Sequence, residues 1–387
     1  MDILIFSIED GRFGPARLPQ IFHEAGLAVA ALCPADNLLA HSGFLRAHHP
    51  LPPSRTIRVI ARALAAAIRE TSPQLIIPGD EQAVILLQAF AGGRCKAVIG
   101  HKARVIIAAS LGDPAMFAAS LLKSDTMALA RSLGIAVPRG QTVASAEVAV
   151  HAAEAIGFPV YLKQSFSWAG VGVAECHDAP ALRAAFAAAR PRRPGLRTLA
   201  RKMMGRDWYP TDAPMDVQSG IAGQCAMYCG LAWRGRLVGG FAGVKLEPVH
   251  GNGPSKIVKL MHDTVLEDVA TRMTAALGFT GFLAFDFMIP HDGGDPLLIE
   301  CNPRPVPVHH LGRHVGVDLA AALARMLDGE APDAAPMPAS RALEVVLFPH
   351  ALDPALARHN RLSDVPGDDP GLIRHVGDPL PATRLAA

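Results

Sequence analysis

The chain has 387 residues, a length that usually divides into two or three domains because single cores rarely grow beyond about 250 to 300 residues. Its formal net charge of +2 provides no overall field that would recruit nucleic acid or an anionic membrane. No uninterrupted apolar run is long enough to span a bilayer. The six cysteines form no CxxC pair, which argues against a zinc knuckle or a disulfide scaffold, and the first residues carry no basic leader. We therefore expect a cytoplasmic protein with reduced thiols.

The first 110 residues alternate between short apolar runs and helical patterns. The apolar runs cover residues 3–7, 27–33 and 74–78, and the helical patterns cover residues 15–25 and 56–69. This alternation predicts βαβ units that form a parallel sheet. Ligands of such sheets bind at the carboxyl ends of the strands.

Two loops follow predicted strands in this region. Residues 10–14 lack the GxGxxG spacing, which argues against an NAD site. Gly79, Asp80 and Glu81 follow the third strand and open the next helix, where the helix dipole favours acidic residues. We expect helix capping to explain these acids, and a role in holding a substrate amine is the less favoured alternative.

Two lysines stand beside predicted loops farther along the chain. The elements expected there are helices at 111–122 and 124–133, a strand at 158–163 and a loop of small residues at 165–172. Lys123 lies at the junction of the two helices, with Ser124 as the expected N-cap. Lys163 ends the buried strand just before the loop, where an ammonium group can neutralise phosphate oxygens while loop N–H groups cover them.

The functional interpretation depends on the stretch from residue 281 to residue 304, which predicts two strands joined by a polar turn. Because side chains alternate between the faces of a strand, Asp286, Glu300 and Asn302 are expected on one face. The residues expected on the opposite, core face are Leu283, Phe285, Phe287, Ile289, Leu297, Ile299 and Cys301.

This polar face has the composition of a magnesium site. Two neighbouring carboxylates repel each other unless a cation or a shared proton lies between them. Carboxylate and amide oxygens, with no thiol or imidazole at ligand spacing, favour Mg²⁺ or Mn²⁺ over zinc. Such ions commonly take further ligands from phosphates, which points to ATP. The alternative is a solvated polar face, which would suffice to explain any single acid.

The second half of the chain also predicts strands at 215–221, 224–234, 236–245 and 342–348 and a helix at 263–277. Lys245 ends one of these strands and is a further candidate for phosphate binding. His309, His310 and His314 do not have the spacing of a zinc motif, so we expect them in a loop or facing a substrate.

The order and spacing of these motifs resemble the ATP-grasp superfamily. The first matching motif is Lys123, which precedes a helix and the run Gly-Ile-x-Val-Pro. The second is Phe-Pro-Val-x-Leu-Lys163, which a Ser/Gly loop follows. The last two are Asp286 and the run Ile-Glu300-Cys-Asn302-Pro-Arg304. The resemblance covers roughly residues 1–330. It implies an α/β and α+β architecture: an N-terminal Rossmann-like parallel sheet, a two-lobed ATP-grasp fold and a small C-terminal closing segment. The corresponding boundaries are 1–110, 111–205, 206–335 and 336–387.

The resemblance also implies roles for single residues. Lys123 and Lys163 would contact the phosphates, and Arg304 would stabilise the phosphoryl or acyl-phosphate intermediate, so Lys163 and Arg304 are the implied catalytic residues. The two acids and the amide of the predicted magnesium site would hold two ions. The other implied nucleotide contacts come from a flexible loop, a hinge and a strand end: Ser165, Gly170, Gly172, Lys202, Met203 and Lys245.

The function implied by the resemblance is an ATP-dependent ligase. It would activate a small carboxylic acid as an acyl phosphate and join it to an amine, releasing ADP and phosphate. A carboxylase relative that uses bicarbonate is one alternative. Arg201 and Lys202 replace the usual hinge acids, and the loop has few glycines, which leaves open a Mg-ATP-binding protein without catalysis. An NAD-dependent oxidoreductase is the most distant alternative. The expected partners are small-molecule substrates, not nucleic acid or a membrane, and a homodimer stays open.

Overall fold

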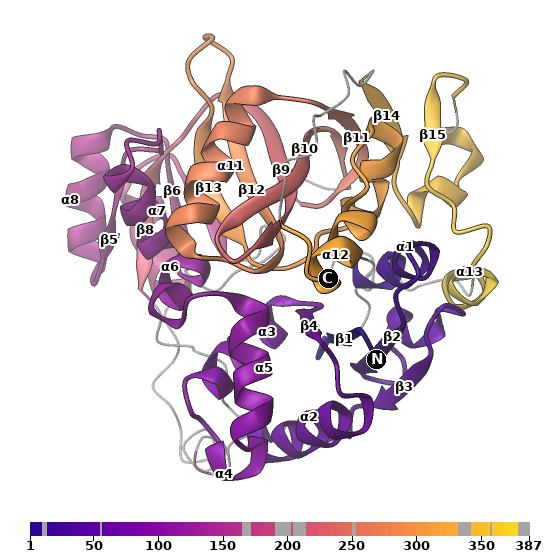
Figure 1. Ribbon diagram of the computed structural model, residues 1–387. Coiled ribbons are helices and arrows are strands. Elements are labelled where there is room, and N and C mark those ends of the chain that lie inside the picture. The colour runs from indigo at the N-terminus through magenta and orange to yellow at the C-terminus, as the bar shows by residue number, and fades with distance from the viewer. Residues whose placement is uncertain are drawn as a thin grey trace.

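The computed structural model describes residues 1–9, 14–54, 56–164, 172–189, 203, 214–249, 253–331, 342–356 and 358–377. These residues form an N-terminal domain, a small lobe and a large sheet that meet at the centre of the molecule (Figure 1). The boundaries predicted near residues 205 and 335 lie outside the described residues. No helix of the described part is both long enough and apolar enough to cross a membrane.

The N-terminal domain contains a four-stranded sheet in the order β3-β2-β1-β4, and all its pairings are parallel, as predicted. Its strands are β1 (Ile3–Phe6), β2 (Val29–Cys33), β3 (Ala47–Pro50) and β4 (Leu75–Pro78). Its helices are η1 (Pro15–Arg17), α1 (Leu18–Glu24), η2 (Leu38–His41), α2 (Ile57–Thr71), α3 (Glu81–Ala91), α4 (Lys96–Ile99) and α5 (His101–Leu111). Strand β1 is buried along its whole length because apolar cores cover both faces of the sheet. The sequence does not predict β3, because His48 and His49 interrupt its apolar pattern.

Short helices connect this domain to the small lobe: η3 (Pro114–Met116), α6 (Phe117–Leu121) and α7 (Lys123–Ser132). The single helix predicted at 111–122 is wrong, because Gly112 interrupts it with φ of 104°. A Cβ atom at this glycine would lie 2.3 Å from the carbonyl oxygen of Gly278, so only glycine fits there. The predicted Ser124 cap is also wrong. Helix α7 begins at Lys123 directly after Leu122 and has no side-chain cap.

The small lobe is an antiparallel sheet in the order β5-β8-β6-β7, packed against two helices. Its elements are β5 (Gly140–Val143), α8 (Ala146–Ile156), β6 (Val160–Gln164), β7 (Val173–Cys176), α9 (Ala179–Ala189) and β8 (Met215–Ser219). Strand β6 is the centre of this lobe, and its residues alternate between buried and partly exposed. This alternation buries Val160 and Leu162 in the lobe and leaves Lys163 near the cavity that separates the lobe from the large sheet.

The large sheet has seven strands in the order β13-β12-β9-β10-β11-β14-β15. The strands are β9 (Gly223–Trp233), β10 (Arg236–Pro248), β11 (Ser255–Met261), β12 (Gly281–Pro290), β13 (Leu297–Asn302), β14 (Leu343–Val346) and β15 (Arg361–Ser363). Helix α11 (Thr264–Leu277) covers one face, while α12 (Leu319–Leu327), η4 (His309–Val315) and the N-terminal domain cover the other. Both faces of β12 are therefore buried near its start. Phe282 and Ala284 are as deeply buried as Leu283 and Phe285.

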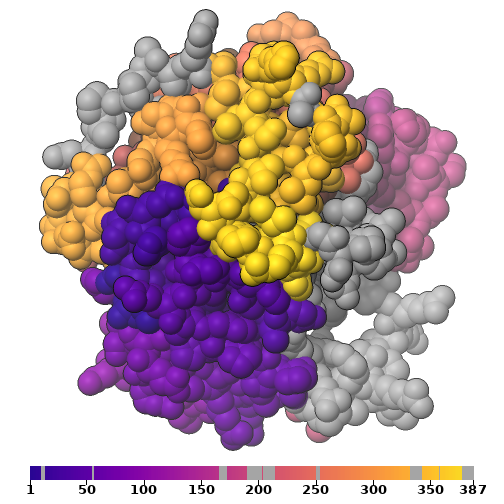
Figure 2. Space-filling view, turned by 90° about the vertical axis from the view of Figure 1, so that its right-hand side faces the viewer, coloured from indigo at the N-terminus to yellow at the C-terminus, as the bar shows by residue number. Residues whose placement is uncertain are grey.

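The C-terminal segment packs against the large sheet and the N-terminal domain. Its strand β14 pairs with β11 and extends the large sheet. The segment ends with α13 (Pro370–Gly377), which lies against η2 of the N-terminal domain (Figure 2). Ser42 donates a 2.6 Å hydrogen bond to Asp369 across this contact. The chain therefore closes back on its beginning.

Candidate active site

A cavity of about 360 Å³ lies where the three parts of the molecule meet. Residues of the N-terminal domain, the small lobe, the large sheet and the C-terminal segment all line it. The predicted site residues that line it are Lys123, Lys163, Lys245, Asp286, Glu300, Asn302 and Arg304. Residues far apart in the sequence thus face one enclosed space, the usual setting of a small-molecule site.

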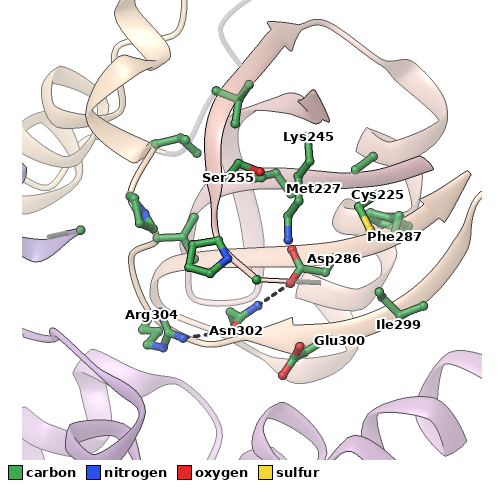
Figure 3. A pocket seen from close by; sticks show the side chains of 18 of the residues that line it. Cys225, Met227, Lys245, Ser255, Asp286, Phe287, Ile299, Glu300, Asn302 and Arg304 are labelled. Atoms are coloured by element: carbon green, nitrogen blue, oxygen red, sulfur yellow. Dashed lines mark hydrogen bonds between the residues drawn. The ribbon is translucent and has the colours of Figure 1, made fainter. Parts of the chain in front are cut away.

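The predicted acidic face forms on β12 and β13. Asp286 pairs with Glu300 and Ala284 pairs with Asn302 in the antiparallel ladder, so these polar residues are direct neighbours. Asn302 Nδ2 donates a 3.2 Å hydrogen bond to Asp286 Oδ2, and Figure 3 shows this contact at the edge of the cavity. All three side chains line the cavity.

The core face predicted for β13 is wrong for two of its residues. The ladder shifts register between Asp286 and Phe287, so Ile299 is an extra residue that has no partner in the pairing. Leu298 is fully buried as a consequence, whereas Leu297 is partly exposed and Ile299 lines the cavity. On β12, Ile289 is also partly exposed. The bulge gives the cavity an apolar side next to the acids.

The two acids lie near different lysines. Burial raises the pKa of Asp286, Lys245 lowers it and Glu300 raises it. In Figure 3 the Asp286 carboxylate lies next to Lys245, whereas Glu300 extends toward the opposite edge of the view. Glu300 Oε1 forms a 3.2 Å ion pair with Lys123 Nζ. The negative charges are therefore already partly compensated by ammonium groups.

The donor set of this corner fits a hard divalent cation. It consists of two carboxylates and one amide oxygen, and such ligands suit Mg²⁺ or Mn²⁺. Among the described residues no group of three His, Cys, Asp or Glu side chains is placed to hold a metal ion. Asp286 and Glu300 supply two carboxylates only, so further ligands would have to come from Asn302, water or a bound phosphate.

The two lysines expected at the phosphates are both withdrawn from solvent. Lys123 begins α7 and is 6% exposed. Burial lowers the pKa of Lys163 to about 8, while Glu300 raises it and Lys123 lowers it. Two carboxylates face these two ammonium groups: Glu300, which pairs with Lys123, and Asp216, the cross-strand partner of Lys163 on β8. Two lysines that line one cavity can neutralise phosphate oxygens.

Arg304 follows β13 and lies beside the acidic face. Its Nη2 donates a 3.3 Å hydrogen bond to Asn302 Oδ1, and its Nη1 donates to the carbonyl oxygen of Pro305. Asn302 therefore bridges Asp286 and Arg304 (Figure 3). These two hydrogen bonds of Asn302 fix the guanidinium group of Arg304 at the edge of the cavity.

Of the remaining predicted nucleotide contacts, Gly172 and Met203 are the ones that the structure describes, and neither lines the cavity. Ser165, Gly170 and Lys202 lie outside the described residues. Gly172 has φ of 78° and closes the β6–β7 hairpin through a 2.9 Å hydrogen bond from Gln164 N. Met203 is 83% exposed and does not line the cavity.

The expectation that His309 and His310 lie in a loop or face a substrate is wrong. Both belong to η4, and they are 1% and 5% exposed. His309 Nδ1 accepts a 2.8 Å hydrogen bond from Val306 N, and its Nε2 lies 3.0 Å from the carbonyl oxygen of Leu283. This histidine ties the segment after Arg304 to β12. Burial lowers the pKa of His309 to about 4.

The neutral state of His309 predicts a loss of stability in mild acid. The unfolded chain takes up a proton near the ordinary pKa of 6.5, whereas the folded protein does so only near 4. Between these values the unfolded state binds more protons, so the free energy of unfolding falls by about 3 kcal/mol as the pH drops from 6.5 to 4. Urea unfolding at several pH values measures this slope. His309→Gln is expected to be less stable at pH 7 but to have a flatter slope, and an unchanged slope would contradict this assignment.

Sequence reasoning gave less weight to Glu81, which lines the cavity. The capping that was expected is performed by Asp80, whose Oδ1 accepts a 2.8 Å hydrogen bond from Ala83 N. Glu81 is the next residue. Burial raises its pKa to about 7, Arg304 lowers it and Glu300 raises it. The signal in the sequence was its place just after a strand of a parallel sheet.

Comparisons with known proteins agree with this geometry. A family model described as the ATP-binding domain of the carbamoyl-phosphate synthase L chain matches residues 123–196. This match begins at Lys123 and includes Lys163. It covers the connecting helix and much of the small lobe.

Several solved structures share the arrangement over most of the chain. A biotin carboxylase from Campylobacter jejuni, solved as a β,γ-ATP complex, has 19% identity and a TM-score of 0.62, covering 84% of this chain and 71% of its own. An L-amino acid ligase from Bacillus licheniformis has 14% identity and a TM-score of 0.58, covering 89% of this chain and 79% of its own. An ADP complex of N5-carboxyaminoimidazole ribonucleotide synthetase has 12% identity and a TM-score of 0.61, covering 89% of this chain and 80% of its own.

Together, the parallel N-terminal sheet, the small lobe and the large mixed sheet surround one charged cavity. The chain has the ATP-grasp fold, and the resemblance drawn from its motifs is confirmed.

Proposed function

We propose that this protein is an ATP-dependent ligase that activates a carboxylic acid as an acyl phosphate and joins it to an amine, releasing ADP and phosphate. The observation that carries the proposal is the single cavity that gathers three lysines, an arginine, two acids and an amide from the small lobe, the large sheet and the linking helix. The fold shared with an L-amino acid ligase supports the same class of reaction.

The chemistry needs positioning and charge more than it needs a protein nucleophile. A carboxylate is a poor electrophile until its oxygen takes the γ-phosphoryl group. Lys123 and Lys163 would neutralise the phosphate oxygens during that transfer. Arg304, which is hydrogen-bonded to Asn302, would stabilise the acyl phosphate. The amine, in its neutral form after its ammonium group has lost a proton to solvent, then attacks the acyl carbon. The bond from this carbon to the phosphate oxygen breaks, phosphate leaves, and the nitrogen of the new amide gives up a second proton to the departing phosphate or to water.

Asp286, Glu300 and Asn302 are the residues that would hold Mg²⁺ or Mn²⁺. The bound cation would neutralise phosphate charge and align the oxygens that attack and leave. Asn302 orients the carboxylate of Asp286 through its hydrogen bond. Lys123 keeps Glu300 at the phosphate side of the cavity through its ion pair.

Replacement of these acids is expected to remove turnover. Asp286→Asn and Glu300→Gln keep the size of the side chains but lose the charge. We expect ATP-dependent ADP release, assayed with a panel of amino acids as acids and amines, to fall by at least about 10-fold to 100-fold. Loss of a residue that supports a metal ligand already has an effect of this size. A coupled ADP assay at saturating Mg²⁺ measures the effect.

Glu147→Gln is a matched control, since Glu147 is exposed on α8 and pairs with Arg183 at the surface. It should turn over as the wild type does. Unchanged turnover in both Asp286→Asn and Glu300→Gln would remove these residues from the metal site.

A carboxylase that phosphorylates bicarbonate is the second candidate. The similarity to biotin carboxylase structures, including one solved with bicarbonate, favours it. In this case ADP release would depend on added bicarbonate and would persist without any other acid. A protein that binds Mg-ATP without catalysis would instead show a thermal shift with Mg-ATP and no ADP release with any acceptor.

A further inference from the structure

The carboxyl end of the N-terminal sheet opens onto the cavity. Strand β1 pairs with β2 on one side and with β4 on the other, so the strand order reverses at β1. In open α/β sheets ligands bind outside the carboxyl ends of the strands at such a switch point. Strand β1 ends at Phe6 and β4 ends at Pro78. The residues just beyond β4, Gly79 to Glu81, line the same cavity as the candidate magnesium site.

Asp80 shapes this crevice but has no capacity left for a ligand. Its Oδ2 accepts hydrogen bonds from Ser7 Oγ at 2.6 Å, Ile8 N at 2.6 Å and Glu9 N at 3.0 Å. Its Oδ1 caps α3, and the side chain is 1% exposed. Asp80 therefore fixes the ends of β1 and β4 relative to each other. This arrangement holds the next residue, Glu81, at the cavity.

The carboxylate of Glu81 has no direct partner in the part of the chain that the structure describes. Among the described residues, no side chain forms an ion pair or a hydrogen bond with it, although it lines the cavity. The nearest cations have other contacts: Arg304 donates to Asn302 and to the Pro305 carbonyl, and Lys123 pairs with Glu300. A carboxylate that is only partly exposed to solvent gains from a cation that a ligand brings into the cavity.

The surroundings of Glu81 also indicate the sign and the shape of that ligand. Glu9, like Glu81, follows a strand of the N-terminal sheet, and Glu9 and Glu300 both add negative charge near Glu81. An anionic group would therefore be repelled from this side and would bind nearer Arg304. Pro15, Val306 and Pro307 provide apolar surface in the same cavity. The backbone of Gly14 packs so closely on Pro307 that a Cβ atom there would lie 3.2 Å from Pro307 N.

We propose that the crevice beyond β1 and β4 binds the amine substrate of the ligase, with Glu81 as the ionic partner of its ammonium group. The amine carries an apolar group that rests on Pro15, Val306 and Pro307. Arg304 is the strongest charged influence on Glu81, so an amine held there lies beside the residue assigned to the acyl phosphate. This inference rests on the proposed ligase function and adds the place and the class of its second substrate.

The test separates activation of the acid from attack by the amine. Hydroxylamine is small and largely uncharged at neutral pH, and it captures acyl phosphates as hydroxamates without an ammonium-binding residue. A panel of amino acids and other small carboxylic acids, each with ATP and hydroxylamine, first identifies the acid. That acid is then assayed for ADP release with aliphatic L-amino acids, such as leucine and valine, as the amine.

We expect Glu81→Gln to raise the KM for the amine by about 10-fold or more, the size of effect that loss of one strong charged contact produces. The ratio of amine-dependent to hydroxylamine-dependent turnover should fall by a similar factor. Glu81→Asp keeps the charge and should lie closer to the wild type. Glu147→Gln again serves as the surface control, and thermal unfolding of each variant checks that it is folded.

Two results would overturn the inference. One is an unchanged amine KM in Glu81→Gln, and the other is a rise in the KM of the acid or of ATP as large as that of the amine. A wild-type protein that forms no hydroxamate and releases no ADP with any acid would overturn the ligase proposal, and the amine site with it. The two kinds of failure are thus distinguishable in one set of assays.

Discussion

Replacing Lys163 with methionine is expected to reduce ATP-dependent turnover by about 100-fold to 1,000-fold while leaving the protein at least as stable as the wild type. The loss in rate follows from removing one preorganised positive group that would face the transferring phosphoryl group. Methionine has nearly the same length and flexibility as lysine, so the strand and its packing should persist. ADP release and denaturation by urea measure the two quantities.

The stability of this variant follows from the electrostatics around Lys163. Burial lowers the pKa of Lys163 to about 8, which means that the folded protein holds the charged lysine at a cost. Lys123 adds to this cost, and Glu300 and Asp216 together offset only part of it. A neutral side chain removes the penalty. Phosphate groups of ATP would offset it in the wild type, so the Mg-ATP-induced thermal shift should shrink or vanish in Lys163→Met.

Lys102→Met provides the matched control, since Lys102 is exposed on α5. It should keep the turnover and the thermal shift of the wild type. If Lys163→Met retained turnover within about threefold of the wild type, Lys163 would have no place on the phosphates, because such a change is well below the loss of one stabilising contact. A strong loss of stability would show that its role is structural.

The sequence supported the parallel N-terminal sheet because short apolar runs alternated with helical patterns, and that signal is local. It also placed Asp286, Glu300 and Asn302 on one face, since cross-strand neighbours follow from alternation alone. It did not reveal the bulge at Ile299, because an extra residue in a ladder has no signature in composition. The consequence was the wrong face for Leu297 and Ile299.

Long-range packing explains the other differences. His309 and His310 follow Arg304 in the sequence, which suggested a substrate-facing loop. The structure buries them because β12 and the C-terminal segment supply their hydrogen-bond partners, and nothing near them in the sequence indicates those partners. Glu81 reaches the cavity for the same kind of reason. Its neighbours in space are Arg304 and Lys123, which belong to other parts of the chain.

Replacing Asp364 with alanine is expected to lower the free energy of unfolding by about 3 to 5 kcal/mol. Asp364 Oδ1 accepts a 2.8 Å hydrogen bond from Arg17 Nη2 and lies 2.9 Å from His310 Nε2, and its Oδ2 accepts a 3.3 Å hydrogen bond from Phe348 N. Arg17 and Asp364 side chains are 8% and 3% exposed. The variant would leave the arginine charge buried without its counter-ion.

The charge state of this cluster supports a large effect. Burial alone would raise the pKa of Asp364, but the contacts with His310 and Arg17 outweigh it and bring the pKa to about 2. The carboxylate is therefore ionised throughout the physiological range. Asp368→Ala is the matched control, because Asp368 lies exposed in the same segment. Its effect should stay within about 0.5 kcal/mol, as for most surface substitutions.

A double-variant cycle decides whether the stranded charge is the cause. Arg17→Met combined with Asp364→Ala removes both ions, so the double variant should be more stable than Asp364→Ala alone. Strict additivity, or a loss below about 1 kcal/mol in Asp364→Ala, would contradict the ion-pair account. The cluster joins η1, η4 and the C-terminal segment, and Pro15, Val308 and Phe348 beside it line the cavity. The shared buried charge therefore acts together with the β11–β14 pairing and the Ser42–Asp369 hydrogen bond to hold the C-terminal segment at the cavity.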